Sequence, residues 1–332
     1  MAKTILSSDK IHTLHHTFYE PRNDAKATLL IVHGMTEHSG RYHQFAEFLT
    51  EHDIAVLTYD QLGHGRTISN AEELGYFSKS HPMQKLLKDV VIMADQLKAK
   101  YPDVPHFIMG HSMGSFVIRN VLQVHSDQFE GAIIMGSSDY NPLLKPMMPV
   151  MEILNKVQPK RHNSVISSAM NIMFNAQLKD KKMDSDHAWL CNNPEAIADY
   201  EKDPLCGFDF TNNGYWTLLK LMEGGLAKDW AETIEHDFPM LFMSGKNDPV
   251  GYMGKAIPKV TKRLKKQGFK HVEKQLYPSM RHEPLHEVEN KKVYQDLLNW
   301  LESQLEKSAE LPTDFIQQIS LKSGTDLILA RP

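Results

Sequence analysis

The strongest constraint on the fold is a regular alternation of short apolar segments with longer segments of helical periodicity. The apolar segments are TLLIVHG, IAVLTYD, HFIMG, GAIIMGS and FPMLFMSG, at residues 28–34, 54–60, 106–110, 131–137 and 238–245. Continuously apolar runs of this length are typical of strands covered on both faces. Strands that alternate with helices form a parallel sheet through crossover connections. The sequence therefore predicts an α/β fold with a mostly parallel central sheet and helices on both faces.

The alternation is interrupted once, between residues 138 and 236. This interval contains helical and irregular segments but no comparable apolar strand, and the pattern resumes directly after it. We predict that residues 1–137 and 237–307 form one α/β core and that residues 138–236, called the cap below, are a mainly helical insertion. Residues 308–332 are expected to lie beyond this fold as a tail, to which the sequence assigns no role.

Composition excludes several classes of function. The net charge of −4 gives no broad basic surface for nucleic acid, and the one basic run, residues 259–270, has the spacing of a solvated helix face. No apolar run approaches the roughly 20 residues of a membrane span. Cys191 and Cys206 are too few for a disulfide framework, and the first residues lack the apolar centre of a signal peptide. A reducing, cytoplasmic location is therefore expected.

One motif carries chemistry. In HFIMGHSMGSF, at residues 106–116, Ser112 lies between Gly110 and Gly114, after a predicted strand and before a predicted helix. G-x-S-x-G in this context is the nucleophile elbow, whose glycines relieve crowding around a strained serine. A helix N-cap serine would explain the start of the helix but not both glycines. We therefore predict that Ser112 is a nucleophile.

A serine hydroxyl needs a base and a group that orients the base, and in this fold class the acid and then the histidine follow the serine. Asp248 comes just after the apolar strand at 238–245, at the edge where a parallel sheet presents functional side chains. Asp237 precedes the same strand and is expected at the opposite edge.

Two histidines follow the last predicted strand in the segment LYPSMRHEPLHE. Loop placement favours His282 as the base, whereas His286 is expected near the start of the terminal helix, facing solvent. The pair is a poor zinc site, because Pro284 interrupts the helical turn between the two side chains and no third ligand is evident.

An acyl-transfer site also needs donors for the oxyanion. The expected donors are two backbone amides, that of Met113, directly after the nucleophile, and that of Met35, in the loop after the strand at 28–34. Gly34 would let the main chain approach the reacting carbonyl.

Four pieces of the sequence together resemble a known family. They are HGMTEHSGRY at 33–42, DQLGHGRT at 60–67, GHSMG at 110–114, and SGKNDPV at 244–250 with MRHE at 280–283. The chain resembles the α/β-hydrolase-fold serine hydrolases, and within them the monoacylglycerol lipase and lysophospholipase-like group.

This resemblance implies a triad of Ser112, Asp248 and His282, with the amides of Met35 and Met113 as the oxyanion hole. It implies that the enzyme uses no cofactor and no metal. The substrate would be a small-molecule carboxylic ester, in particular a medium- or long-chain acyl ester such as a monoacylglycerol or a lysophospholipid, and the cap would admit its acyl chain.

The methionines bear on the substrate. The chain has 18, and those of the cap include Met147, Met148, Met151, Met170, Met173 and Met222. Flexible thioethers suit an acyl channel or transient contact with lipid aggregates, although the same residues would also suit an ordinary cap core.

Three other functions are weighed. A peptidase of the same fold could hold a substrate amine with the acidic cluster Glu195, Asp199, Glu201 and Asp203, which a solvated helix face also explains. An acyltransferase would use the same acyl-enzyme but exclude water. A binding module without activity is disfavoured, because every catalytic residue type is retained.

The remaining polar residues of the motifs are expected to be structural. His33, His38, His64 and His111 should hold loops together through hydrogen bonds rather than ligate a metal. Glu37 and Arg41 should pin the oxyanion loop by an ion pair.

Overall fold

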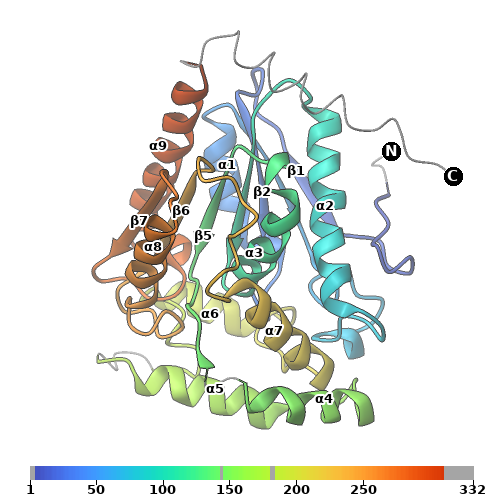
Figure 1. Ribbon diagram of the computed structural model, residues 1–332. Coiled ribbons are helices and arrows are strands. Elements are labelled where there is room, and N and C mark those ends of the chain that lie inside the picture. Colours follow the sequence, from blue (N-terminus) through green and yellow to red (C-terminus); the bar gives the residue numbers. More distant parts are fainter. Residues whose placement is uncertain (1–3, 143–144, 180–183, 310–332) are drawn as a thin grey trace, which may run out of the picture.

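A seven-stranded sheet forms the centre of the computed structural model, which describes residues 4–142, 145–179 and 184–309 (Figure 1). Its strand order is β1-β3-β2-β4-β5-β6-β7. The strands are β1 His16–Tyr19, β2 Ala27–Val32, β3 Ile54–Tyr59, β4 His106–His111, β5 Gly131–Met135, β6 Met240–Gly245 and β7 Val272–Tyr277. Strand β1 pairs antiparallel with β3, and the other neighbours are parallel. The predicted mostly parallel sheet is confirmed.

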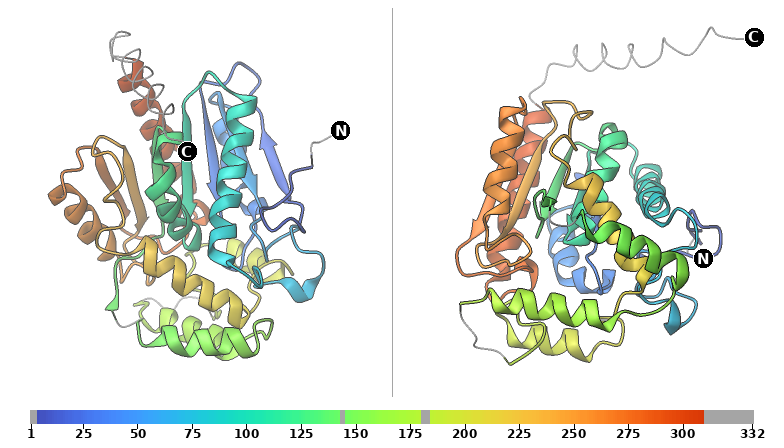
Figure 2. Two further views of the ribbon diagram at one scale, coloured as in Figure 1. Left: turned by 45° about the vertical axis from the view of Figure 1, so that its right-hand side comes forward. Right: turned by 60° about the horizontal axis from the view of Figure 1, so that its bottom comes forward.

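Helices cover both faces of the sheet (Figure 2). One face is covered by α1 (His43–Thr50) and α9 (Asn290–Ala309), and the other by α2 (Pro82–Lys100), α3 (Met113–His125) and α8 (Ala256–Lys266). Short 3-10 helices occupy Ser39–Tyr42 (η1), Ala71–Glu73 (η2), Ser126–Gln128 (η3) and Pro284–His286 (η5).

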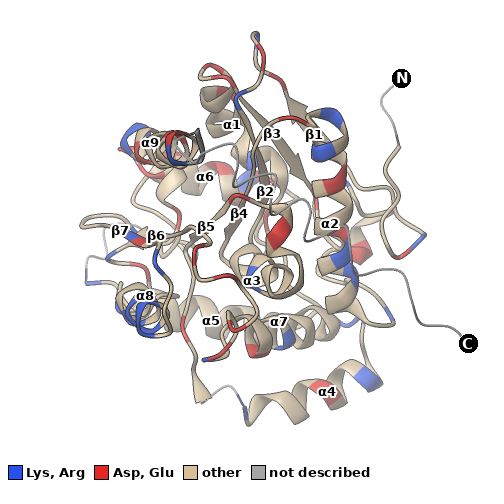
Figure 3. Cartoon of the chain, turned by 45° about the horizontal axis from the view of Figure 1, so that its top comes forward, with Lys and Arg blue, Asp and Glu red and all other residues tan. Residues whose placement is uncertain are grey.

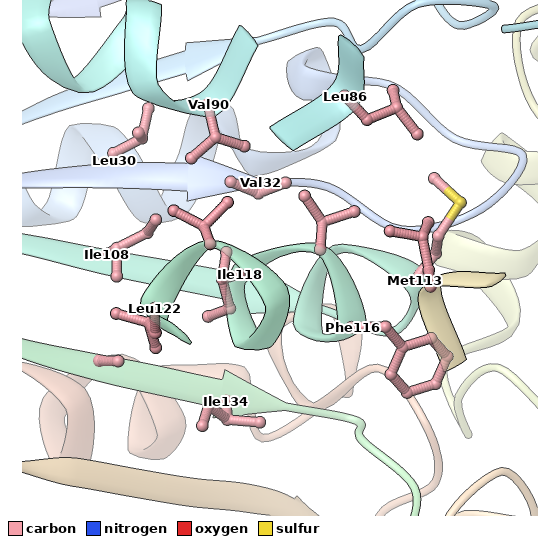
Figure 4. Packing of buried hydrophobic residues seen from close by; sticks show 14 of the residues in the cluster. Leu30, Val32, Leu86, Val90, Ile108, Met113, Phe116, Ile118, Leu122 and Ile134 are labelled. Carbon is pink, nitrogen blue, oxygen red and sulfur yellow. The ribbon is translucent and has the colours of Figure 1, made fainter. Parts of the chain in front are cut away.

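The apolar strand segments follow from this two-sided cover. Successive side chains of a strand point to opposite faces, so each face needs its own apolar residues. In β2, Leu30 and Val32 pack with α2 and α3 (Figure 4), whereas Leu29 and Ile31 pack with α1 and α9. Burying each such side chain stabilises the fold by about 1.5–3 kcal/mol. The sheet is therefore a rigid platform whose strand ends can hold loops in fixed positions.

The cap residues form four helices in the described part of the chain: α4 (Met147–Val157), α5 (Ser164–Ala176), α6 (Pro194–Lys202) and α7 (Asn212–Gly225). In Figure 1, α4 and α5 form a layer below one end of the sheet. Part of the cap has its own apolar cluster, which includes Phe174 and Trp189. Helix α7 instead packs on α3 within the main core. The limits of the cap at 138 and 236 stay a prediction.

Two local features concern β1 and α8. Strand β1 begins at His16, because Lys10, with a φ of 63°, turns the preceding segment back so that Leu6 bridges Thr13. The basic run lies on and just after α8, which carries many Lys and Arg positions (Figure 3), and the lysines of this helix are exposed, as expected of a solvated face.

Of the predicted tail, residues 310–332 lie outside the described residues. Across the described ranges, the helices are too short or too polar to span a membrane.

Candidate active site

Ser112 occupies a strained turn between β4 and α3. Its φ of 51° and ψ of −119° are rare for a residue with a side chain. A Cβ on Gly110 would lie 2.4 Å from the Gly114 carbonyl oxygen, and a Cβ on Gly114 would lie 2.1 Å from that of Val32. Backbone atoms cannot move aside as a flexible side chain would, so both glycines are required. The predicted elbow geometry is present.

Asp248 and His282 follow two neighbouring strands, β6 and β7, and their side chains meet. Nδ1 of His282 donates to Oδ1 of Asp248 at 3.0 Å, and both side chains are buried. The hydroxyl of Ser244 donates to Oδ2 of Asp248 at 2.6 Å. Burial alone would raise the pKa of Asp248, but the charge and hydrogen bond of His282 lower it below its ordinary value. The carboxylate therefore stays ionised and fixes the imidazole with Nε2 unprotonated in the neutral ring.

The serine elbow lies beside this imidazole. A Cβ on Gly136 would lie 3.0 Å from Cε1 of His282 and 3.1 Å from the ring of His111, the residue before Ser112. Nε2 of His282 is buried and has no hydrogen-bond partner among the described residues, and the structure shows no hydrogen bond between it and the Ser112 hydroxyl. Such catalytic hydrogen bonds often form only when substrate is bound. Nε2 is thus free to accept a proton.

The loop of residues 33–38, called the oxyanion loop after its expected role, is held by Glu37. Oε1 of Glu37 accepts from the Gly34 amide at 2.6 Å and from the Tyr42 hydroxyl at 2.9 Å, and Arg41 pairs with Oε2 at 2.7 Å. Burial would raise the pKa of Glu37, but the charge of Arg41 and the hydrogen bond from His111 hold it well below the usual range. The expected ion pair between Glu37 and Arg41 is present, whereas the oxyanion role of this loop stays a prediction.

The two expected oxyanion donors flank the elbow. Met113 is the first residue of α3, so its amide has no acceptor within the helix. Met35 follows Gly34, and a Cβ placed on Gly34 would lie 3.1 Å from Cβ of Ser112. The role of these amides stays a prediction.

The loop that carries His282, residues 278–283, is tied to the oxyanion loop by a pair that the sequence does not reveal. The guanidinium of Arg41 donates to both carboxylate oxygens of Glu283, each at 2.7 Å. Burial would raise the pKa of Glu283, but Arg41 lowers it to about 2. The loop that carries His282 and the loop of residues 33–38 are therefore joined through one buried cation, Arg41.

The prediction that His286 faces solvent is wrong. Its side chain is 18% exposed, and Nε2 donates to the carbonyl oxygen of Arg41 at 3.0 Å. Burial, with the nearby charge of Arg41, lowers the pKa of His286 to about 4. The cause is local: Pro284 starts the short helix η5, which folds this residue inward before α9 begins at Asn290.

A buried arginine behind the elbow is a second feature that sequence reasoning missed. Arg119 on α3 donates to the Ser137 hydroxyl at 3.3 Å and to the Ser138 carbonyl at 3.1 Å, and its guanidinium lies 4.4 Å from the Trp230 ring centre. Ser115 lies within hydrogen-bond distance of both Ser137 and the carbonyl of Ser112. The one available signal is a charge inside the apolar stretch SFVIRNVL.

The other motif histidines form hydrogen bonds that hold neighbouring segments in place, as expected. Nε2 of His33 accepts from the Gln61 amide at 3.0 Å, and His64 bonds to the Leu62 carbonyl at 3.0 Å. His111 bonds to Glu37 at 3.1 Å.

His38 lies within the described group of side chains that comes closest to a metal-ligand arrangement, together with Asp203 and Cys206. Nδ1 of His38 accepts from the Gly40 amide at 3.1 Å, so the proton is on Nε2, which donates to Asp203 at 2.9 Å. A metal would have to displace that proton, and the arrangement favours a hydrogen-bonded clamp between the oxyanion loop and the cap.

Comparison with known proteins places this site in context. A family model described as serine aminopeptidase, S33, matches residues 23–289. The monoglyceride lipase homolog of Monkeypox virus is 26% identical over 70% of this chain and 75% of that protein. The monoacylglycerol lipase of Mycolicibacterium smegmatis is 22% identical over 86% of this chain and 92% of that protein. The carboxyl esterase of Bacillus coagulans, solved with glycerol, superposes with a TM-score of 0.83 at 24% identity, over 91% of this chain and 98% of that one, which shows a common fold.

Proposed function

This chain belongs to the serine aminopeptidase S33 family of α/β hydrolases, and from that premise we propose that it is a carboxylic ester hydrolase acting through an acyl-enzyme on Ser112. The observation that carries the proposal is the strained serine elbow beside a buried Asp248–His282 pair whose Nε2 is free. The monoglyceride and monoacylglycerol lipases among its relatives support an ester substrate.

The proposed cycle uses the chain's own groups. His282 takes the hydroxyl proton of Ser112 as the serine oxygen attacks the ester carbonyl, and Asp248 stabilises the imidazolium. The amides of Met35 and Met113 hold the oxyanion. The imidazolium then gives its proton to the leaving alcohol, which leaves an acyl-serine. His282 next deprotonates water, which attacks the acyl carbon, and the serine leaves with the proton as the fatty acid is released.

The exposed face of the cap supports a medium- or long-chain acyl ester. Large apolar side chains are exposed on α4 at Met147, Val150, Ile153 and Val157, and on α5 at Val165, Ile172 and Met173. On α4 they recur every three or four residues and so form one stripe, called the α4 stripe below. Exposed apolar surface of this kind marks a site of contact with other apolar matter. We propose transient contact with lipid aggregates, from which monoacylglycerols or lysophospholipids would enter.

The cap methionines divide between the two roles considered for them. Met151 is buried, and Met148, Met170 and Met222 pack against the core, whereas Met147 and Met173 are exposed. The exposed pair is available to an acyl chain or a lipid surface.

The acidic cluster gives less support to a peptidase. Asp203 accepts from His38 at 2.9 Å, and Glu201 accepts from the Ser185 hydroxyl at 2.6 Å. Both carboxylates are therefore engaged in structural bonds rather than directed at a substrate amine.

A substrate panel tests the proposal. Purified protein would be assayed on p-nitrophenyl esters from acetyl to palmitoyl, on a monoacylglycerol, on a lysophospholipid and on an aminoacyl amide, with Ser112→Ala as the matched control. We expect ester turnover to rise with chain length and to fall by roughly 10³ or more in Ser112→Ala, with an unchanged melting temperature. Near-full activity of Ser112→Ala would reject the acyl-enzyme, and preference for the aminoacyl amide would favour a peptidase.

A further inference from the structure

The cap places an aromatic ring against the proposed base. The indole of Trp189 lies with its ring centre 5.2 Å from that of the His282 imidazole, at an interplanar angle of 42°. Trp189 is itself buried, and its Nε1 donates to Oδ1 of Asn171 on α5 at 3.0 Å. Phe174, also on α5, packs against Trp189, and the centres of these two rings are 4.8 Å apart. The indole is therefore held in one orientation from within the cap.

The backbone on both sides of this contact is also fixed. Arg281, which precedes His282, donates to the carbonyl oxygens of Ala188 and Cys191. The amide of Glu283, which follows His282, donates to the carbonyl oxygen of Leu190 at 2.8 Å. The chain neighbours of the base thus hold the chain neighbours of Trp189.

A third residue, Glu287, connects the same two segments. Glu287 accepts from the amide of Asn192 at 2.9 Å and from the amide of Arg281 at 2.7 Å. The ring contact therefore lies inside a continuous network between the cap and the loop of residues 278–283, and does not depend on the rings alone.

The indole distinguishes between the two states of the base. An aromatic face attracts a cation whose centre lies within about 6 Å, most strongly when the ring is that of tryptophan and the site is dry. His282 is neutral before reaction and cationic once it has taken the serine proton. A contact that favours the charged ring over the neutral one lowers the barrier rather than only binding the ground state.

We infer that Trp189 is a positioning residue that holds the His282 ring and stabilises its imidazolium during acyl transfer. The inference rests on the proposed function, because it requires His282 to be the base. Other titratable and charged groups also surround this histidine. Asp248 and His111 contact its ring, and Arg281 and Glu283 are its neighbours in the chain. Glu37 bonds to His111, and Arg41 and His286 pair with Glu283. None of these is changed in the test, so their influence on the pH profile is constant.

The test compares Trp189→Leu with Trp189→Phe, using a soluble short-chain p-nitrophenyl ester. Trp189→Leu should lower kcat by about tenfold and move the acidic limb of the kcat/KM profile to lower pH, because loss of the aromatic face destabilises the imidazolium. Trp189→Phe retains a ring and should restore most of kcat and the position of the limb. Phe174→Leu is the matched control, since it removes packing from Trp189 without touching His282, and it should leave the limb in place.

Several outcomes would overturn the inference. One is a Trp189→Leu protein with unchanged kcat and an unchanged acidic limb. Another is a loss of kcat that Phe does not rescue while the limb stays in place, which would mean a packing role alone. If Trp189→Leu does not fold, Trp189→Met is read by the same criteria. His282→Ala separates the two proposals: if it keeps full activity, the proposed function fails, whereas an inactive His282→Ala with an unaffected Trp189→Leu leaves the function standing and rejects only the role of Trp189.

Discussion

The sheet core and the outer helices of the cap differ in how much of their apolar surface is buried. Helix α3 has ten buried residues and lies directly on the sheet, whereas α4 has one, Met151. The core thus fixes backbone atoms at van der Waals distance around Ser112, while the cap leaves much of its apolar surface uncovered. In the proposed function this difference corresponds to two tasks: the core would hold the reacting groups, and the outer cap would present a surface for apolar matter.

Helix α7 shows that this division follows packing rather than chain order. It belongs by sequence to the interval without strands, yet nine of its residues are buried, and it packs on α3. Asn120 of α3 donates to the Leu221 carbonyl of α7 at 2.9 Å. The comparison is therefore between the α3-centred core, with α7, and the outer helices α4 and α5.

Matched glycine substitutions in the core and in the cap test this comparison, and they have the largest expected effect on the free energy of unfolding. In Gly114→Ala the new Cβ would lie 2.1 Å from the Val32 carbonyl oxygen, which cannot withdraw. In Gly207→Ala, within the cap, the nearest side-chain atom is 3.3 Å away and the main cost is the positive φ of 67°. We expect Gly114→Ala to lose at least about 3 kcal/mol of stability or to fail to fold, and Gly207→Ala to lose about 1–2 kcal/mol. Thermal unfolding and ester turnover measure both, and equal losses would contradict the contrast.

The same contrast explains what the sequence could predict. Strands such as β2 are buried at every position and almost entirely apolar, because both faces of the sheet are covered, so the apolar pattern alone predicts the strand. Ser112 could be predicted as a nucleophile because its motif is local, Asp248 because it follows a strand at the edge where a parallel sheet presents functional side chains, and His282 because it lies in a loop after the last strand.

Other features depend on contacts that no local pattern encodes. The pair Arg41–Glu283 joins residues 242 positions apart, and the bonds of Arg119 depend on how α3 packs. The burial of His286 was not predicted, because helical periodicity extends the terminal helix backwards over the turn at Pro284. For α4, the apolar stripe predicts a helix but not that the stripe is left exposed.

The buried Arg41–Glu283 ion pair gives a test within the core. Glu283→Gln leaves Arg41 with only the Glu37 carboxylate, and removing one partner of a buried pair typically costs about 3 kcal/mol or more. Because the pKa of Glu283 in the folded state is about 2, below its ordinary value of 4.5, the ionised carboxylate stabilises the fold above pH 4.5 and this contribution is lost as the pH falls from 4.5 towards 2. Urea unfolding at neutral and acidic pH should show the gap between wild type and Glu283→Gln closing in that window, and a gap independent of pH would refute the assignment.

The α4 stripe tests the cap side of the comparison. The double substitution of Val150 and Ile153 by Ser removes exposed apolar surface worth roughly 1–2 kcal/mol at an interface, so turnover of a vesicle-borne acyl ester should fall about tenfold. Turnover of a soluble short ester should stay within about twofold of wild type, because the core is untouched. Ser substitutions at Glu152 and Lys156, an exposed ion pair on the same helix, serve as the control. Loss on the soluble ester as well would mean that α4 supports the site rather than the contact with lipid.

The smallest effect is expected at His286, and it separates packing from chemistry inside the core. Its Nε2 donates one hydrogen bond to the Arg41 carbonyl, and the amide of Asn can replace that bond in part. His286→Asn should therefore lower the free energy of unfolding by about 0.5–1.5 kcal/mol and leave ester turnover within about threefold of wild type. His282→Asn should lose roughly 10³.

The pH dependence of stability gives the second readout for His286. Because its folded pKa is about 4, against an ordinary value of 6.5, the unfolded chain binds a proton that the folded protein does not, and wild type loses stability as the pH falls from 6.5 to about 4. His286→Asn should lose less over the same interval. Equal kinetic losses at the two histidines would show instead that His286 takes part in proton transfer, and the core would then hold two competing bases rather than one base and one packing residue.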